Sequence, residues 1–475
     1  MNKLMKVIRE LFAPKDMCQG APWKRIAEFA FPMLIGNFAQ QLYSTVDAIV
    51  VGNSKWGYNG LAAVGNATPV VNLLLALFVG ISTGAGILVS QYFGAKDKEN
   101  LSKTIGNCIS ITAIACVIIM VVGPLMTSPM LKAMGTLPEL YDESKAYLDI
   151  TFIGISGFFF YNIFSGALRG LGDSITALLF LILTSLINIV LDILFVDSMG
   201  VAGVALATII AQVISAVLCL WKLLCMRDLF VINKASMKMD RKVLGGIVKL
   251  GLPSGITQAV FSIAMMAVQG LVNGFNDAMF VACNVMVMRV DGYAMLPNFS
   301  FGQAMGTYAG QNVGAKRIDR LASGNRQGLI MALVTALVLT PMVLLGGPFL
   351  MGLFTKETAL IDMAMGMMYI LAVGYVAMAV TQVLSGTMRG AGDTMTPMWV
   401  SFATTVLLRV PLAYVLVALA KNAGAQVLMQ EKMVFVSLLC TWVLGAAITS
   451  FLYIKGTWKK KQVRAIELEL QNAAK

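Results

Sequence analysis

The sequence predicts an all-α polytopic membrane protein with twelve transmembrane helices in two six-helix lobes, related by internal pseudo-two-fold duplication. Three observations support this fold class: an apolar composition, a series of long apolar segments, and a repeat of one half of the chain in the other. Hydrophobic residues make up 58% of the 475 residues, charged residues make up 13%, and the mean hydropathy is +0.79. A soluble chain carries about a quarter charged residues, so this composition is typical of a chain that lies mostly in a bilayer.

Twelve apolar segments are each long enough to cross the hydrocarbon core of a bilayer, which takes about 20 helical residues. They are residues 27–53, 61–92, 104–126, 146–168, 174–197, 200–224, 245–275, 279–311, 327–349, 359–388, 395–419 and 433–454. Several of them exceed the required length, so we expect tilted helices or helices that extend past the bilayer.

Lys and Arg are distributed very unevenly between the two sides of this arrangement. One side holds 28 of the 36, the other side holds six, and Arg289 and Arg409 lie within spans. The richer side is cytoplasmic by the positive-inside rule, so we expect a multi-pass protein of the cell (inner) membrane with both termini in the cytoplasm. This distribution also accounts for the net charge of +12, so we expect no nucleic-acid partner.

The expected domains follow from the spans and the loops between them. They are a cytoplasmic amphipathic segment (1–25), an N-terminal six-helix lobe (26–225), a cytoplasmic linker (226–242), a C-terminal six-helix lobe (243–456) and a basic cytoplasmic tail (457–475). The first segment has no apolar core followed by a cleavage site, which argues against a signal peptide.

The chain is duplicated at a constant offset. FSGALRGLGDSIT (164–176) returns as LSGTMRGAGDTMT (384–396), and VSQYFGAKDKENL (89–101) returns as AGQNVGAKRIDRL (309–321). Six spans per repeat is an even number, so both lobes have the same orientation and should be related by an axis along the membrane normal. The repeated motifs fall on cytoplasmic turns, where Gly allows a tight turn and Asp caps the next helix, so we interpret them as structural.

No residue pattern indicates an enzyme, a disulfide framework or a bound cofactor. The chain has no His, and its seven Cys show neither a CxxC pair nor a metal-ligand spacing. It also lacks a nucleophile motif and paired acids on adjacent turns. We therefore expect a membrane protein that is not an enzyme and that needs no cofactor apart from a coupling ion.

The first span, FAFPMLIGNFAQQLYSTVDAIVVGN (29–53), combines an apolar body with one polar face. At 100° per residue its polar side chains fall within a narrow arc. They are Asn37, Gln40, Ser44 and Asp47. An ionisable side chain on a spanning helix usually faces a cavity or the bundle interior, so Asp47 is a candidate functional residue. The alternative is an Asp at the membrane surface, since Asp47 lies about 33 Å of helix from Arg25.

These segments resemble the multidrug and toxic compound extrusion (MATE) family. The resemblance rests on PMLIGNFAQQLYSTVDAIVVG, LAAVG, GISTGAGILVSQYFGAKD and SGALRGLGD in the first half, and on FGQAMGTYAGQNVGAKRIDR and SGTMRGAGDTMTP in the second. It covers nearly the whole chain. It implies efflux of amphipathic, often cationic compounds, driven by inward flow of Na⁺ or H⁺.

The resemblance also implies an ion site in the N-terminal lobe. Asp47 matches the acid of the first helix, Asn188 and Asp192 match the Asn-x-x-x-Asp of the fifth span, and Thr208 matches the hydroxyl of the sixth. Two carboxylates, an amide and a hydroxyl could hold Na⁺, or the two carboxylates could share a proton. Ion binding would let the first helix bend at Pro32, a candidate hinge because proline removes a backbone hydrogen bond. The alternative is that Asn188 and Asp192 only cross-link helices.

The second lobe keeps the scaffold of the repeat without these acids. At the offset of the repeated motifs, Asn188 and Asp192 become Leu408 and Leu412, and residues 253–275 and 364–388 contain no Asp or Glu. Because the NorM branch of the family has additional acids in its seventh and tenth spans, the chain is more similar to the DinF-like branch.

Three charged residues nevertheless lie inside spans of the second lobe. Arg289 and Asp291 are in the eighth span and Arg409 is in the eleventh. Residues two apart on a helix do not face each other, so Asp291 can pair more easily with Arg409 than with Arg289. We expect a buried structural ion pair, and the alternative is a role in gating or in contact with substrate.

The sequence thus predicts a cation-coupled antiporter that exports amphipathic, often cationic drugs and toxic compounds by alternating access, as a monomer among membrane lipids. Duplicated lobes with a one-sided ion site suit alternating access better than a channel. The main alternative is a flippase for lipids or lipid-linked precursors with the same architecture. A flippase would need a strongly cationic cavity to hold pyrophosphate, and only Arg289 and Arg409 are available.

Overall fold

The computed structural model describes residues 14–55, 57–134, 136, 138–352, 355–456 and 458–459. Every regular element in this part of the chain is a helix, which confirms the predicted all-α class. Most of the amphipathic stretch expected in segment 1–25, and nearly all of the tail 457–475, lie outside the described residues.

The helices coincide with the predicted spans. In the first half they are α2 (Pro22–Asn53), α3 (Gly57–Gly94), α4 (Lys98–Ala133), α5 (Pro138–Ile153), α6 (Ile155–Gly170), α7 (Ser174–Met199) and α8 (Val201–Cys225). In the second half they are α9 (Arg241–Asn273), α10 (Ala278–Gly314), α11 (Ile318–Gly352), α12 (Thr358–Gly390), α13 (Met395–Phe402), the π-helix η1 (Ala403–Leu408), α14 (Arg409–Asn422) and α15 (Val427–Lys455).

Ten helices of the described chain are long and apolar enough to cross a membrane, and the number rises to eleven if α5 and α6 form one span. α5 and α6 are bent by 51° at Gly154, so the predicted span 146–168 is broken rather than straight. The remaining predicted span is α2, a helix of 32 residues with Pro32 inside it.

The chain divides into two compact units, each described by itself below. Unit 1 comprises Met1–Asp16 and Phe31–Gly255, and unit 2 comprises Met17–Ala30 and Ile256–Lys475. The chain passes between the units three times: between Asp16 and Met17, ahead of α2, and then inside the helices α2 and α9. The sequence instead suggested a linker at 226–242. That loop belongs to unit 1, where it is fastened to α4: Ser110 Oγ donates to the carbonyl of Met237 at 2.7 Å.

The repeated turn motifs have the structural role predicted for them. Gly172 and Gly392 have φ values of 85° and 92°, in the left-handed region that favours glycine. The following acids cap the next helices, since Asp173 Oδ1 accepts from the Thr176 amide at 3.0 Å and Asp393 caps its helix in the same way. Burial raises the pKa of Asp173, and Lys222, 3.6 Å away, opposes this effect.

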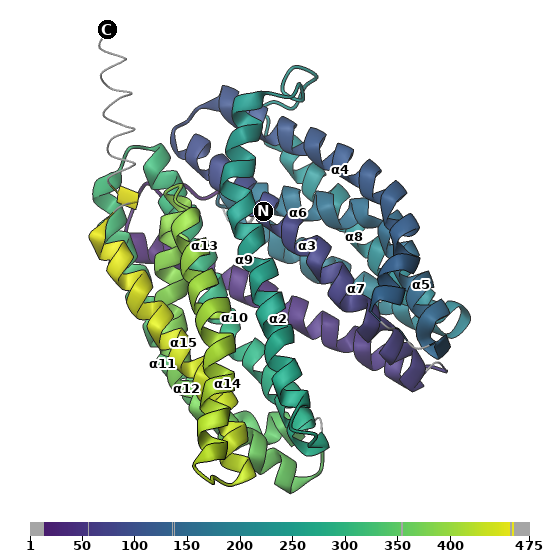
Figure 1. The fold of residues 1–475 in the computed structure, drawn as a ribbon. Helices are drawn as coiled ribbons and strands as arrows, with labels where there is room; N and C mark the ends of the chain where they lie inside the picture. The colour runs from purple at the N-terminus through teal and green to yellow at the C-terminus, as the bar shows by residue number, and fades with distance from the viewer. Residues whose placement is uncertain are drawn as a thin grey trace, which may run out of the picture. The chain divides into compact units, whose positions relative to one another are not determined.

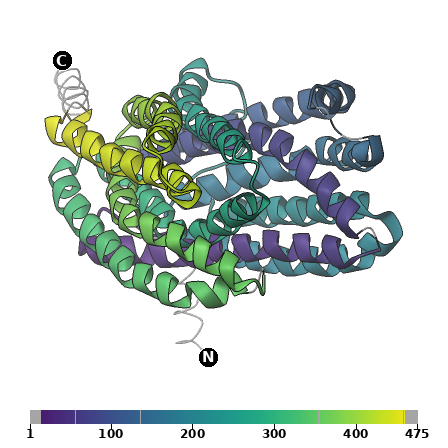
Figure 2. The same ribbon diagram turned by 60° about the horizontal axis from the view of Figure 1, so that its bottom comes forward.

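Close helix packing in unit 2 depends on glycines of α10 and α12, which run side by side in the bundle (Figures 1 and 2). A β-carbon added to Gly386 would collide with the carbonyl oxygen of Gly302, and one added to Gly390 would collide with that of Gly306. Small residues spaced four apart on both helices thus let the backbones touch, as is common in membrane helices.

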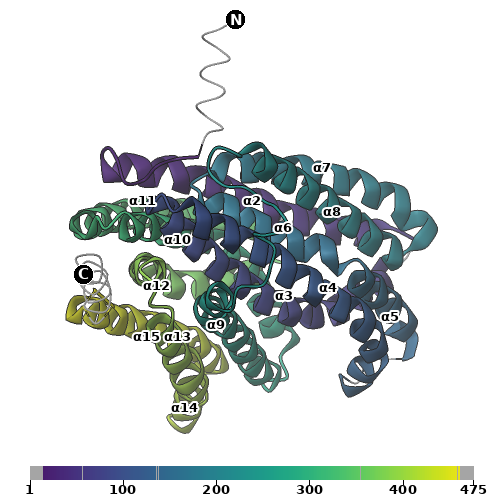
Figure 3. The same ribbon diagram turned by 90° about the horizontal axis from the view of Figure 1, so that it is seen from above.

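Unit 1 repeats this crossing at the positions that the duplication predicts. α6 packs against α3 and α8 (Figure 3). A β-carbon on Gly166 would collide with Ser82, and one on Gly170 would approach the carbonyl oxygen of Gly86 to 2.6 Å. The duplicated motif therefore specifies a helix crossing as well as a turn, which sequence analysis did not recognise.

Gly386→Ala should destabilise the protein because the added methyl group must push α10 and α12 apart. Overpacking of this kind costs about 1–3 kcal/mol, whereas alanine in an open helical position is favoured over glycine by about 1 kcal/mol. Gly346→Ala is the matched control, since no atom lies within 4 Å of its added β-carbon. The melting temperature in detergent should fall for Gly386→Ala alone, and equal melting temperatures would contradict this account of the crossing.

Candidate functional site

The predicted acids of unit 1 meet at a position well inside the helices. Asp192 lies about 27 Å along α7 from its first residue, Ser174, at 1.5 Å per residue. Asp47 comes from the second half of α2 and is half-buried, while Asp192 has no exposed surface. The two carboxyl groups lie within hydrogen-bonding reach of each other.

Asn188 connects the two acids. We assign the orientation of its amide from the surrounding donors and acceptors: with Nδ2 turned towards the acids, it donates to Asp47 Oδ1 and to Asp192 Oδ2, both at 3.1 Å. The amide oxygen accepts from the backbone nitrogen of Thr208 at 3.1 Å. One fully buried side chain therefore joins α2, α7 and α8, and it supplies each carboxylate with a donor in surroundings from which water is excluded.

Two tyrosines that sequence analysis missed face the same cluster. The hydroxyl of Tyr43 donates to Thr208 Oγ1 at 3.4 Å and also bonds the carboxyl group of Asp47. Tyr147 of α5 lies close enough to interact electrostatically with Asp47 and Asp192. Tyr43 could have been found, because it precedes Asp47 by four residues and so shares its helix face. No spacing in the sequence indicates Tyr147.

The other residues of the polar arc in α2 lie elsewhere along the helix. Gln40 and Asn37 are about 10 and 15 Å of helix before Asp47, and they are exposed and half-buried, respectively. Ser44 lies in α2, but its side chain is outside the described residues. The cluster at Asp47 is therefore smaller than the polar arc.

The donor set of the cluster allows two kinds of ligand. The described residues contain no group of three or more His, Cys, Asp or Glu side chains placed to hold a metal ion. Two carboxylates, an amide and a hydroxyl can still supply the oxygen ligands that Na⁺ accepts. The same two carboxylates can instead share one proton, because like charges at hydrogen-bonding distance cannot both remain ionised at low cost.

The charged residues of unit 2 do not form a single cluster. Arg289 is exposed on α10, whereas Asp291 two residues later bonds the hydroxyl of Tyr375. Arg409 is 3% exposed and donates through Nη2 to the sulfur of Met265 at 3.4 Å. Asp291 and Arg409 attract each other. Among the described residues, however, no ion pair within 4.0 Å joins them. The expected ion pair is therefore a longer-range electrostatic attraction without direct contact.

The fold and the buried acids define a membrane transporter, and comparison with known proteins gives its family. The family profile described as MatE matches residues 32–194 and 253–415. The chain therefore belongs to the MatE family. The profile matches once in each half, which agrees with the duplication in the sequence.

Curated relatives cover nearly the whole chain. The "Probable multidrug resistance protein YoeA" of Bacillus subtilis is 28% identical over 97% of this chain and 99% of its own length. The "Probable multidrug resistance protein NorM" of Thermotoga maritima is 25% identical, over 93% of this chain and 94% of its own length. The "DNA damage-inducible protein F" of Escherichia coli is 23% identical, over 72% of this chain and 74% of its own length, so the relatives include a protein of the predicted branch.

Solved structures share the fold. One, described as the "Outward-facing conformation of a multidrug resistance MATE family transporter of the MOP superfamily", is 25% identical with a TM-score of 0.86, over 94% of this chain and 98% of that chain. Another, from Pyrococcus furiosus, is described by the phrase "Reverse polarity of binding pocket suggests different function". It is 25% identical with a TM-score of 0.85, over 94% of this chain and 97% of that chain. These matches confirm the predicted two-lobe architecture.

Proposed function

We propose that the chain exports amphipathic, often cationic compounds in exchange for an inward-flowing cation, by alternating access. The observation that carries this proposal is the buried cluster in which Asn188 joins Asp47 and Asp192. A charged side chain inside a membrane is costly, and such residues commonly mark ion pathways. The relatives described as multidrug resistance proteins support two parts of this proposal, that the cargo is a small molecule and that it leaves the cell.

Coupling would follow from the charge of this cluster. Without a bound cation the two carboxylates repel each other, and the donors from Asn188 and Tyr43 offset part of the repulsion. A cation that neutralises them would draw α2 and α7 together. Because Pro32 lacks a backbone hydrogen bond, we propose that α2 bends there, next to the point where the chain passes between the units at Ala30–Phe31. Such a bend would shrink the space that unit 1 leaves for the cargo and release it.

We favour H⁺ over Na⁺ as the coupling ion, because the carboxyl groups of Asp47 and Asp192 lie within hydrogen-bonding reach of each other and can share one proton. The Asn188 amide does not discriminate between the two ions. With its nitrogen towards the acids it satisfies an ion-free cluster, and with Nδ2 towards Thr208 Oγ1, at 3.4 Å, its oxygen would face a cation held by the acids.

Transport in proteoliposomes separates this proposal from its alternative. Purified protein should release a fluorescent cationic amphiphile when a pH gradient is imposed alone, and an Na⁺ gradient alone should have a smaller effect. Movement of a labelled lipid or lipid-linked pyrophosphate, without drug movement, would favour the flippase instead.

Asp47→Asn should abolish drug export while the protein still folds and inserts, because the variant keeps the shape of the side chain but cannot gain or lose the coupling proton. Asp197→Asn is the matched control: Asp197 is an exposed acid on α7, five residues beyond Asp192. Export should fall to that of empty liposomes for Asp47→Asn and stay at the wild-type level for Asp197→Asn. Wild-type export by correctly inserted Asp47→Asn would rule out a coupling role.

Drug and cation should bind antagonistically, since each is proposed to favour a different state of unit 1. Drug affinity in detergent should weaken as the pH falls, by a factor within about 5–150, the usual range of such coupling. Asp192→Asn should remove most of this dependence. If neither H⁺ nor Na⁺ weakens drug binding to the wild-type protein, the antagonism is wrong, and if Asp192→Asn keeps the full effect, the coupling site lies elsewhere.

The charge distribution predicts that loop 226–242 is cytoplasmic, and the structure shows where to place a reporter. Ser236 is 6% exposed and would be a poor site, whereas Lys234 is exposed. Lys234→Cys in a cysteine-free background should resist an impermeant thiol reagent in intact cells. Lys356→Cys, exposed in the segment between α11 and α12, should react. The opposite labelling pattern would reverse the orientation.

A further inference from the structure

Three polar side chains of unit 2 lie at a similar depth, far from the ends of their helices. Asp291 is about 20 Å of helix from Ala278, the first residue of α10, and Arg409 is about 20 Å from Asn422, the last residue of α14. Tyr375 is about 26 Å along α12. These distances place all three within the hydrocarbon layer, where unneeded charge is costly.

The three groups interact but leave hydrogen-bonding capacity unused. The hydroxyl of Tyr375 donates to Met368 Sδ at 4.0 Å and also lies within reach of Asp291, and Arg409 attracts the same carboxylate. Arg409 itself bonds Met265, whose thioether is a weak acceptor for a guanidinium group. Within the described chain, neither Asp291 Oδ1 nor Arg409 Nε has a hydrogen-bond partner, although both atoms are buried. The carboxylate and the guanidinium are thus held near each other without the direct contact that would lock them together.

The π-helix explains how Arg409 reaches this position. A π turn closes i→i+5 hydrogen bonds and so holds one more residue than an α turn. η1 ends at Leu408, and Arg409 is the first residue of α14. The extra residue of the π turn therefore rotates Arg409 to a different face of the helix from the one that a continuous α-helix would give it.

A fixed guanidinium decides which ligand Asp291 can take. A metal cation entering beside Asp291 would meet the positive charge of Arg409 and would find a single carboxylate. A proton carries its charge onto the carboxyl group itself and needs no further ligand. Among the described residues, Tyr375 of α12 and Arg409 of α14 are the titratable groups that act on Asp291.

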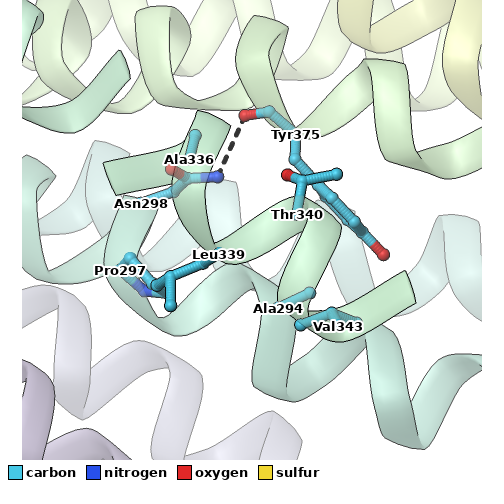
Figure 4. Close-up of a pocket in the computed structure, with 8 residues that line it drawn as sticks. All are labelled: Ala294, Pro297, Asn298, Ala336, Leu339, Thr340, Val343 and Tyr375. Carbon is cyan, nitrogen blue, oxygen red and sulfur yellow. Dashed lines mark hydrogen bonds between the residues drawn. The ribbon is translucent and has the colours of Figure 1, made fainter. Parts of the chain in front are cut away.

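A small cavity adjoins Tyr375 on the side of α11. Its volume of about 10 Å³ is that of a single water, and its lining includes Asn298 and Thr340, whose buried Oγ1 has no hydrogen-bond partner in the described structure. Figure 4 shows the Asn298 amide bonded to the backbone carbonyl of Tyr375, at 3.2 Å, while the phenol points away from it. The polar surroundings of Tyr375 thus continue from Asp291 towards α11.

We propose that Asp291, Tyr375 and Arg409 form a second proton-binding site, in unit 2, in which Asp291 takes up the proton and Arg409 is the resident counter-charge. Protonation removes the charge that attracts Arg409, and deprotonation restores it, so the site exchanges one proton without a metal ion. This proposal does not depend on drug export, because protonation of Asp291 is measurable at equilibrium.

Infrared spectroscopy of the purified full-length protein tests the proposal, since a protonated carboxyl group has a carbonyl band that a carboxylate lacks. The wild type should show a band that titrates in Na⁺-free buffer and that persists in the Asp47→Asn, Asp192→Asn double variant. Asp291→Asn should remove the band, and added Na⁺ should leave it unchanged. Arg409→Met should move the titration midpoint to higher pH by about 1–3 units, because the carboxylate loses its counter-charge. Arg409→Lys should move it much less.

Two further variants keep the test decisive if Asp291→Asn does not fold. Tyr375→Phe removes the hydrogen bond to Asp291 and should shift the frequency of the band. Glu431→Gln is the control, since Glu431 is another buried acid of unit 2, 2% exposed, and should leave the band unchanged. The proposal is overturned if Asp291→Asn or Tyr375→Phe leaves every band in place, if Na⁺ displaces the band, or if Arg409→Met leaves the midpoint unchanged.

Discussion

The hydrogen bonds of one buried amide hold together the charged centre of unit 1. Asn188 donates to both Asp47 and Asp192 and accepts from the backbone of α8, so three helices depend on its orientation. In a medium without water, two carboxylates near each other need either a shared donor or a neutralising cation. Asn188 supplies the donor, and we propose that a coupling cation neutralises the pair. The stability of the helix arrangement and the proposed coupling therefore depend on the same contacts.

The helix crossings explain why both units can share a scaffold while their charges differ. In each unit, small residues spaced four apart bring two backbones into contact, through Gly166 and Gly170 in one and Gly386 and Gly390 in the other. These contacts involve backbone atoms and need no particular chemistry in neighbouring side chains. Polar groups could therefore diverge after duplication. Unit 1 carries an acid pair joined by Asn188, whereas unit 2 carries Asp291 and the buried Arg409.

Much of the candidate site was accessible from the sequence, and its limits have physical reasons. Asp47, Asn188 and Asp192 stand out because polar residues are rare in spanning segments and because helical periodicity gives their faces. The amide orientation, the approach of Tyr147 and the separation of Asp291 from Arg409 come from the packing of helices distant in the sequence. Periodicity describes one helix at a time, so it cannot give the distance between two of them.

The sequence by itself determined the all-helical class, the position of most spans, the duplication and the identity of the acids. It could do so because the bilayer sets the length and polarity of each span, and because a repeat is visible in the residues themselves. The tertiary structure decided that α2 and α9 each belong partly to both units, and that α5 and α6 bend by 51°. It also decided that a π turn directly precedes Arg409. These features depend on how backbones fit against neighbouring helices, which local composition does not encode.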